Sequence, residues 1–192
     1  MSNGSSISKR TAVAVLNSVG ISKIKKFTFQ GHTFSPDVLA MMAWEIENGY
    51  MDVVYEPKLS DKAIYNSSEN KLYVGFWVAG SISRQALIVH EVTHAMFDFK
   101  AAKMDVATSE SISYIAQCQY ARAVSTSSDP EERLYSEIEA KDKVFQVAWG
   151  IAGKLLSGGT VNETDVSQMR QAISGHPEYA TDATASAGYN GY

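Results

Sequence analysis

The order of apolar and polar residues predicts a mixed first half and a helical second half of the chain. Residues 9–20 carry apolar side chains at helical spacing and end at a glycine. Residues 35–49 begin with Ser-Pro and also end at a glycine, so both segments predict helices. Alternating runs at 27–34, 50–57 and 63–80 predict strands, the last of them a hairpin with "NSSEN" as its loop.

After Gly80 the apolar positions change to a period of 3.6 residues. They predict helices over residues 83–100, 108–125, 130–156 and 163–174. The predicted fold class is therefore α+β, with a small, mostly antiparallel sheet followed by a helical half.

The domain organisation follows from the same patterns. Residues 1–8 are small and polar, which predicts a disordered N-terminus, and residues 9–174 show no break in composition that would divide them into two domains. Residues 175–192 are rich in small residues without periodicity and predict an irregular C-terminal tail.

Composition narrows the function classes. The chain has 192 residues, of which 45% are hydrophobic and 20% charged, as in soluble globular proteins. A net charge of −4 without a long basic cluster argues against a nucleic-acid partner. No apolar run reaches the ~18 residues of a transmembrane segment, and the first residues lack the apolar core of a secretion signal. We therefore expect cytoplasmic synthesis, with export by a route that needs no cleaved signal left open.

The stretch "QALIVHEVTHAMFDFK", residues 85–100, carries the candidate chemistry. His90 and His94 are four residues apart, so on a helix they lie on one face, where both can bind the same tetrahedral ion. Glu91 lies beside them and can reach a water on that ion. "HEVTH" is the H-E-x-x-H pattern of zinc-dependent hydrolases. Because Cys118 is the one cysteine, a cysteine-based zinc site is excluded.

A catalytic zinc ion needs a third protein ligand. Asp98 lies eight residues after His90, roughly 12 Å along the helix axis, which is too far for one ion. Glu110 begins the next predicted helix, and the short connection lets the two helices pack as antiparallel neighbours. Glu110 is therefore the leading candidate, and His176 in the tail is the alternative.

"HEVTH" followed by "SESISYI" resembles the gluzincin metallopeptidases, whose second helix carries a glutamate ligand. The resemblance covers Gln85 to Gln117 and implies a zincin-like fold and one Zn²⁺ ion. It implies His90, His94 and Glu110 as the zinc ligands, with Glu91 as general base and acid in the hydrolysis of peptide bonds.

The resemblance has two departures. Ser109 stands where these enzymes usually have an asparagine, and Tyr114 where an aspartate often orients the first histidine. The chain also looks like short bacterial domains that pair "VHE.THA" with an "AYIAQ"-type helix, a group that includes peptidase toxins. That likeness implies a secreted or delivered effector, with a cognate inhibitor or immunity protein as a partner.

Further parts of a peptidase can be assigned to candidate residues. Residues 70–77 either form a sheet edge that pairs with an extended peptide or are an ordinary strand, and Gly75 would let another backbone approach. Tyr135, His176 and Tyr179 are candidate donors to a transition-state oxyanion.

Two functional hypotheses follow. The first is a zinc-dependent hydrolase, with an endopeptidase as the leading form. The second is a non-catalytic binding or interaction module in which zinc only holds helices together. A structural site has four protein ligands, whereas a catalytic site keeps one position open for water, so the ligand set distinguishes them.

Overall fold

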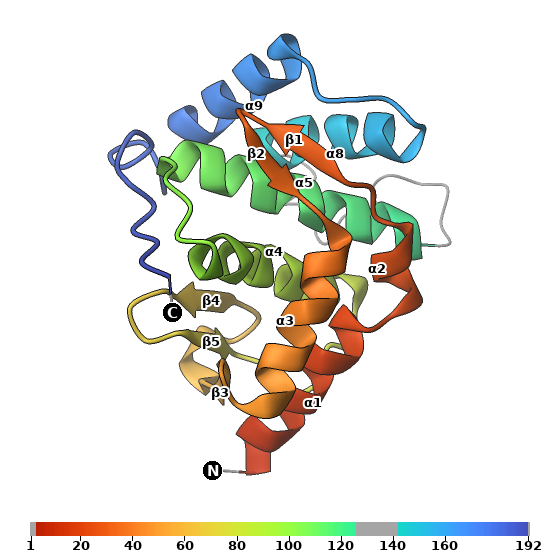
Figure 1. Cartoon of the computed structure of the whole chain (residues 1–192), viewed down its shortest axis with the longest axis vertical. Coiled ribbons are helices and arrows are strands. Elements are labelled where there is room, and N and C mark those ends of the chain that lie inside the picture. The colour runs from red at the N-terminus through yellow and green to blue at the C-terminus, as the bar shows by residue number, and fades with distance from the viewer. Residues whose placement is uncertain (1–2, 126–141, 192) are drawn as a thin grey trace.

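A computed structural model describes residues 3–125 and 142–191 of the chain. Within these ranges, helix α4 (Ile82–Phe99) runs through the middle of the molecule. A small sheet and two helices lie on one side of α4, and the other helices lie on its opposite side (Figure 1). The predicted α+β class, with a small sheet and a helical half, is confirmed.

The first half begins with helix α1 (Asn3–Leu16), followed by α2 (Val19–Lys23). The prediction of disorder is therefore wrong for residues 3–8. Their small polar side chains find partners in the fold: the Ser8 hydroxyl is buried and donates to the Phe76 carbonyl at 3.1 Å, and the Ser5 hydroxyl accepts from the Tyr55 amide at 3.2 Å.

A short hairpin and a third helix complete this half. Strands β1 (Phe27–Phe29) and β2 (His32–Phe34) pair antiparallel, and helix α3 (Pro36–Asn48) follows. Helix α3 ends at Gly49, whose φ of 80° places it in the left-handed region that ends helices. These elements confirm the turn and the helix that the sequence pattern predicts.

The main sheet has three strands in the order β3-β5-β4. Strands β4 (Ala63–Asn66) and β5 (Lys71–Val74) form the predicted antiparallel hairpin, and β3 (Asp52–Tyr55) pairs parallel to β5. A one-turn helix, η1 (Pro57–Leu59), joins β3 to β4.

Strand β5 is therefore central. Of the two alternatives for residues 70–77, the substrate-binding sheet edge is wrong, and the ordinary strand is confirmed over residues 71–74. Gly75 does allow a close backbone approach, as expected, but the backbone is that of Leu59 and Ser60 in the same chain. The outer edge next to α4 belongs to β4.

The helical half contains α5 (Val106–Val124), α8 (Lys143–Leu156) and α9 (Glu163–Gly175). Helix α5 packs between α4 and α8, so it is buried over most of its length. The third predicted helix, 130–156, is confirmed over α8, and its residues 130–141 lie outside the described ranges.

The C-terminal tail, residues 176–191, has an irregular conformation, as predicted. It runs back along the start of α5 and ends near β4 (Figure 1). Backbone hydrogen bonds attach it there: Val106 and Ala107 of α5 donate to the carbonyls of Ala185 and Ala183, both at 2.9 Å. The tail is thus part of the folded domain.

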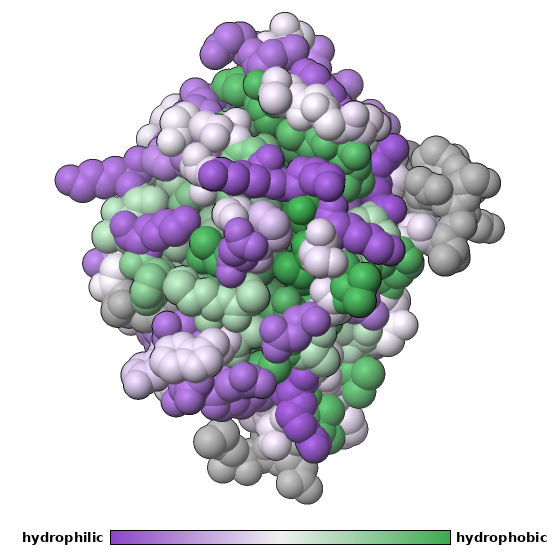
Figure 2. Space-filling model, turned by 45° about the vertical axis from the view of Figure 1, so that its right-hand side comes forward, coloured by the Kyte–Doolittle hydropathy of each residue, from purple (hydrophilic) through white to green (hydrophobic). Residues whose placement is uncertain are grey.

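The surface carries both hydrophilic and hydrophobic side chains, as the mixed composition of the chain predicts. Hydrophilic and hydrophobic side chains lie interspersed over the face shown in Figure 2. Among the described helices, none is both long enough and apolar enough to cross a membrane.

Candidate metal centre

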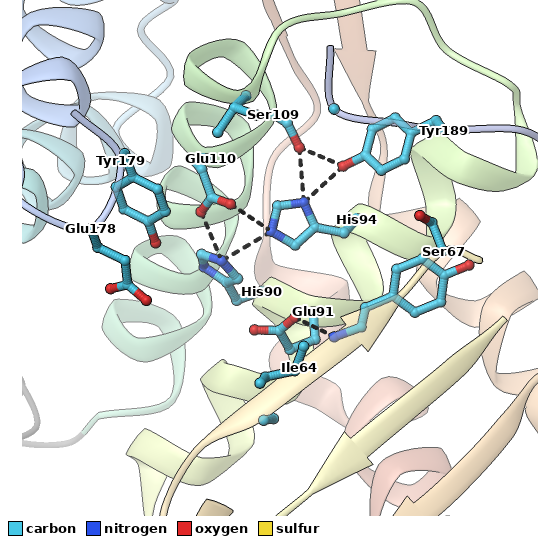
Figure 3. Close-up of a pocket in the computed structure, with 14 residues that line it drawn as sticks. Ile64, Ser67, His90, Glu91, His94, Ser109, Glu110, Glu178, Tyr179 and Tyr189 are labelled. Atoms are coloured by element: carbon cyan, nitrogen blue, oxygen red, sulfur yellow. Dashed lines mark hydrogen bonds and ion pairs between the residues drawn. The ribbon is translucent and has the colours of Figure 1, made fainter. Parts of the chain in front are cut away.

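The two histidines of "HEVTH" lie one turn apart on α4 and face α5. Their Nε2 atoms are 3.1 Å apart, and both side chains are largely buried (Figure 3). The i, i+4 spacing produces this arrangement directly, as predicted from the sequence.

Glu110 lies in the second turn of α5 and points at both histidines. Its Oε2 is 3.3 Å from Nε2 of His90, and its Oε1 is 3.5 Å from Nε2 of His94. Oε2 is also a buried oxygen that accepts no hydrogen bond within the described residues. Buried polar atoms normally have a partner, so this oxygen indicates a ligand.

The spacing of the three donors fits a metal ion. A tetrahedral ion with bonds of about 2.0–2.1 Å separates its donors by about 3.3 Å. The two Nε2 atoms are 3.1 Å apart, and they lie 3.3 and 3.5 Å from the two oxygens of the Glu110 carboxylate. His90, His94 and Glu110 therefore form a group that could hold a metal ion.

The two other sequence candidates lie apart from this group. His176 pairs with Asp142, 3.1 Å away, and so is not the third member. Asp98 is buried and accepts a hydrogen bond from the Tyr65 hydroxyl at 2.7 Å, which agrees with its exclusion as a ligand.

The protonation of His94 and Glu110 suits metal binding. Burial lowers the pKa of His94 to about 4, so its ring is neutral at pH 7 and has a lone pair for a cation. Burial also opposes protonation of His90, but the neighbouring carboxylates of Glu110 and Glu91 outweigh it and raise the pKa of His90, so a metal ion would have to displace a proton from this ring. Burial likewise disfavours the charged form of Glu110, yet the two histidines lower its pKa and keep it ionised.

The outer ring nitrogen of each histidine is also bound. His90 Nδ1 lies 2.8 Å from Oε1 of Gln117, and His94 Nδ1 lies 2.8 Å from the Ser109 hydroxyl and 2.8 Å from the Tyr189 hydroxyl. With Nδ1 donating its proton to these acceptors, Nε2 of each ring is left for the ion.

In gluzincins an aspartate at the position of Tyr114 often orients the first histidine. Here Gln117, and not Tyr114, contacts Nδ1 of that histidine, His90. Tyr114 instead packs its ring edge-on against His90, with centroids 4.6 Å apart, and its hydroxyl is 3.0 Å from that of Tyr179. Gln117 is seven residues after Glu110 and so shares its helix face, a spacing that could have identified it. Tyr189 carries no such signal, because the tail has no periodicity.

Glu91 is buried beside His90, and its carboxylate accepts the Tyr65 backbone N–H of β4 at 2.8 Å. Burial raises the pKa of Glu91 to about 7, although the charge of His90 and the Tyr65 hydrogen bond oppose the rise. A carboxylate that titrates near neutral pH can both accept and return a proton.

His90, His94, Glu110 and Glu91 line a cavity of about 330 Å³. Strand β4 forms one wall through residues 63–65, helices α4 and α5 provide the metal group and Glu91, and the tail provides Glu178, Tyr179 and Tyr189 (Figure 3). Of the candidate oxyanion donors, Tyr179 lines the cavity, His176 does not, and Tyr135 lies outside the described residues.

No protein-family model, no curated protein and no solved structure matches the chain.

Proposed function

We propose that the protein is a zincin-like, zinc-dependent metallopeptidase. One observation carries the proposal: the donors of His90, His94 and Glu110 converge at separations of 3.1 to 3.5 Å, with Glu91 beside them in an open cavity. A metal group without a neighbouring base would support only binding, and a carboxyl base without the metal group would lack an electrophile.

Zinc suits the donor set. Two neutral imidazoles and one carboxylate are the protein ligands of known catalytic zinc sites, and the donor spacing matches tetrahedral bonds of about 2.0–2.1 Å. Among the described residues, no fourth His, Cys, Asp or Glu belongs to the group. Three protein ligands favour a catalytic over a purely structural site, because the fourth position is left for water or substrate.

Glu91 is the proposed general base and acid. A bound zinc ion would lower the pKa of water to about 7 and polarise a substrate carbonyl. The ionised Glu91 then takes the proton of the attacking water and passes it to the leaving amine. Its hydrogen bond from the Tyr65 amide holds the carboxylate in place and ties the base to β4.

The cleft has two features that suit a peptide substrate. The outer edge of β4 lines the cavity, and an extended peptide can pair with main-chain groups of such an edge other than the Tyr65 N–H, which donates to Glu91. Tyr179 lines the same cavity, and burial raises the pKa of its hydroxyl, which therefore stays protonated as a donor to a developing oxyanion.

Substitution of Glu91 tests the proposal. Glu91→Gln is nearly isosteric and should bind zinc as the wild type does. Its rate of peptide cleavage in a complex peptide mixture, followed by mass spectrometry, should fall by about 10²-fold or more. Glu47→Gln, an exposed glutamate of α3, is the matched control and should cleave normally. Equal cleavage by Glu91→Gln and wild type would contradict the mechanism.

The non-catalytic module is separated from the peptidase by a second measurement. A hydroxamate needs an open position on the metal, so it should bind the zinc-loaded wild type and should not bind His94→Ala, which lacks a ligand. Zinc binding without hydroxamate binding would favour the structural module. The effector interpretation stays a prediction: wild type should slow the growth of a bacterial host more than Glu91→Gln.

A further inference from the structure

The end of the tail is held at the C-terminal end of α4 by a buried carboxylate. Oδ1 of Asp98 accepts the backbone N–H of Asn190 at 2.8 Å and that of Gly191 at 3.3 Å, while Oδ2 accepts the Tyr65 hydroxyl. Hydrogen bonds to an ionised acceptor are stronger than neutral ones. Asp98 therefore fixes the path of the tail relative to α4 and β4.

This attachment determines where Tyr189 points. Gly188 and Gly191 have φ values of 76° and 69°, so the backbone turns on both sides of Tyr189 through conformations that glycine adopts without strain. The Tyr189 ring is directed toward His94, and its hydroxyl reaches His94 Nδ1 at 2.8 Å and also hydrogen-bonds the Ser109 hydroxyl (Figure 3).

The direction of contact excludes a blocking role for Tyr189. Its hydroxyl meets the Nδ1 side of His94, whereas the metal-facing atom is Nε2, which points toward Glu110 (Figure 3). The tyrosine thus approaches the histidine from behind the metal group. The Tyr189 hydroxyl can accept from Nδ1–H of His94 while it donates to the Ser109 hydroxyl.

We propose that Tyr189 is a positioning residue for the metal ligand His94, and that Asp98 holds it in place through the neighbouring backbone. The inference rests on the proposed metal site. The tail then contributes directly to the metal centre. The Tyr189 hydroxyl favours the form of His94 that is protonated on Nδ1 and fixes the orientation of the His94 ring, so that Nε2 points toward the ion. Ser109 lies in the segment that resembles gluzincins, and its hydroxyl is only one of the groups that contact His94 Nδ1.

The test compares the metal affinity of single variants. Tyr189→Phe removes one oxygen, and we expect zinc binding, measured by competition with a chromogenic chelator, to weaken about 10- to 100-fold. The visible absorption of the Co²⁺-substituted protein should shift as the coordination of His94 changes. Tyr50→Phe, an exposed tyrosine stacked on Trp44, is the matched control and should keep the wild-type affinity and spectrum.

A second variant and a second readout separate positioning from folding. Asp98→Asn keeps the volume but weakens the attachment of the tail, and should reduce zinc affinity in the same direction. Thermal unfolding in excess chelator reports whether either variant destabilises the metal-free fold. A Tyr189→Phe protein with wild-type zinc affinity and Co²⁺ spectrum would overturn the inference. Failure of the wild type itself to bind zinc would instead overturn the proposed function, so the two failures are distinguishable.

Discussion

At the residue scale, the two metal-facing histidines are supported by different chemical groups. His90 Nδ1 contacts the side-chain amide of Gln117, whereas His94 Nδ1 lies 2.8 Å from the hydroxyls of Ser109 and Tyr189 and 3.4 Å from that of Ser113. All of these groups are neutral. A carboxylate hydrogen-bonded to Nδ1 makes a histidine ligand more basic than a neutral acceptor does. Replacing a neutral acceptor by a carboxylate should therefore strengthen metal binding.

Replacement of Gln117 by glutamate tests this point. Gln117→Glu places an ionised acceptor on His90 Nδ1, so we expect zinc affinity to rise several-fold in a chelator competition. The same change puts a charge at a position that is 3% exposed, so the metal-free protein should lose about 1–3 kcal/mol of stability in chemical denaturation. Unchanged affinity would show that Gln117 does not act on the metal through His90.

The pKa of Glu91 sets the acidic limb of the proposed activity. Burial raises this pKa from 4.5 to about 7, and a bound cation favours the ionised form and moves it back toward the ordinary value. The base must be ionised to accept a proton, so kcat/KM should rise with pH through a midpoint between 4.5 and about 7. A profile that falls over this range would contradict the role of Glu91 as a base.

Much of this site could be predicted from sequence because its spacing is local. His90, Glu91 and His94 follow from one helix period, and Glu110 follows from the start of the next helix. Gln117 shares a helix face with Glu110 and was within reach of the same reasoning. Tyr189 was not, because it is brought to His94 by a hydrogen bond from the Asn190 backbone N–H to the Asp98 carboxylate, and these two residues are 92 positions apart in the chain.

At the element scale, the boundaries of α3, α4, α5 and α9 and the β4–β5 hairpin could be predicted, whereas the boundaries of α1, the separate helix α2 and the strand order could not. The hairpin depends on nearby residues, but β3 reaches β5 by parallel pairing that carries no local signal. Helix α1 extends to Asn3 because Ser5 and Ser8 hydrogen-bond to backbone groups of distant residues. The presence of small polar side chains in the sequence does not predict such contacts.

The start of α5, which presents Glu110, is fixed by Asp105. Its carboxylate caps the helix by accepting the Thr108 amide at 2.8 Å and pairs with Arg170 of α9 at 2.8 Å. Both side chains are 27% exposed. Asp105→Asn keeps a capping oxygen but loses the ion pair, so we expect a loss of about 1 kcal/mol at pH 7 in urea unfolding.

The pH dependence of that loss has a defined sign. The hydrogen bond from Arg170 lowers the pKa of Asp105 below its unfolded value of about 3.9. Its contribution is therefore fully present above about pH 5 and is lost as pH falls through the folded pKa. The difference between wild type and Asp105→Asn should shrink below pH 4, and a difference that grows there would contradict the assignment.

At the scale of the whole molecule, the metal group joins the parts that flank the cleft. His90 and His94 belong to α4, which packs against β4, and Glu110 belongs to α5, which packs against α8. An ion bound by all three would hold α4 to α5 across a largely buried contact. Its binding free energy then adds to the stability of the folded chain, because the unfolded chain does not bring the donors together.

Metal loading should therefore raise the thermal stability of the protein. Free zinc at 100 times its Kd stabilises the folded state by about 2.7 kcal/mol. For a domain of this size each kcal/mol corresponds to about 2–4 °C, so we expect Tm to rise by about 5–11 °C in differential scanning fluorimetry. His94→Ala lacks one donor and should show a much smaller rise, while Glu91→Gln keeps all three and should respond as the wild type does. Equal rises in His94→Ala and wild type would mean that zinc stabilises the protein from somewhere other than the α4–α5 group.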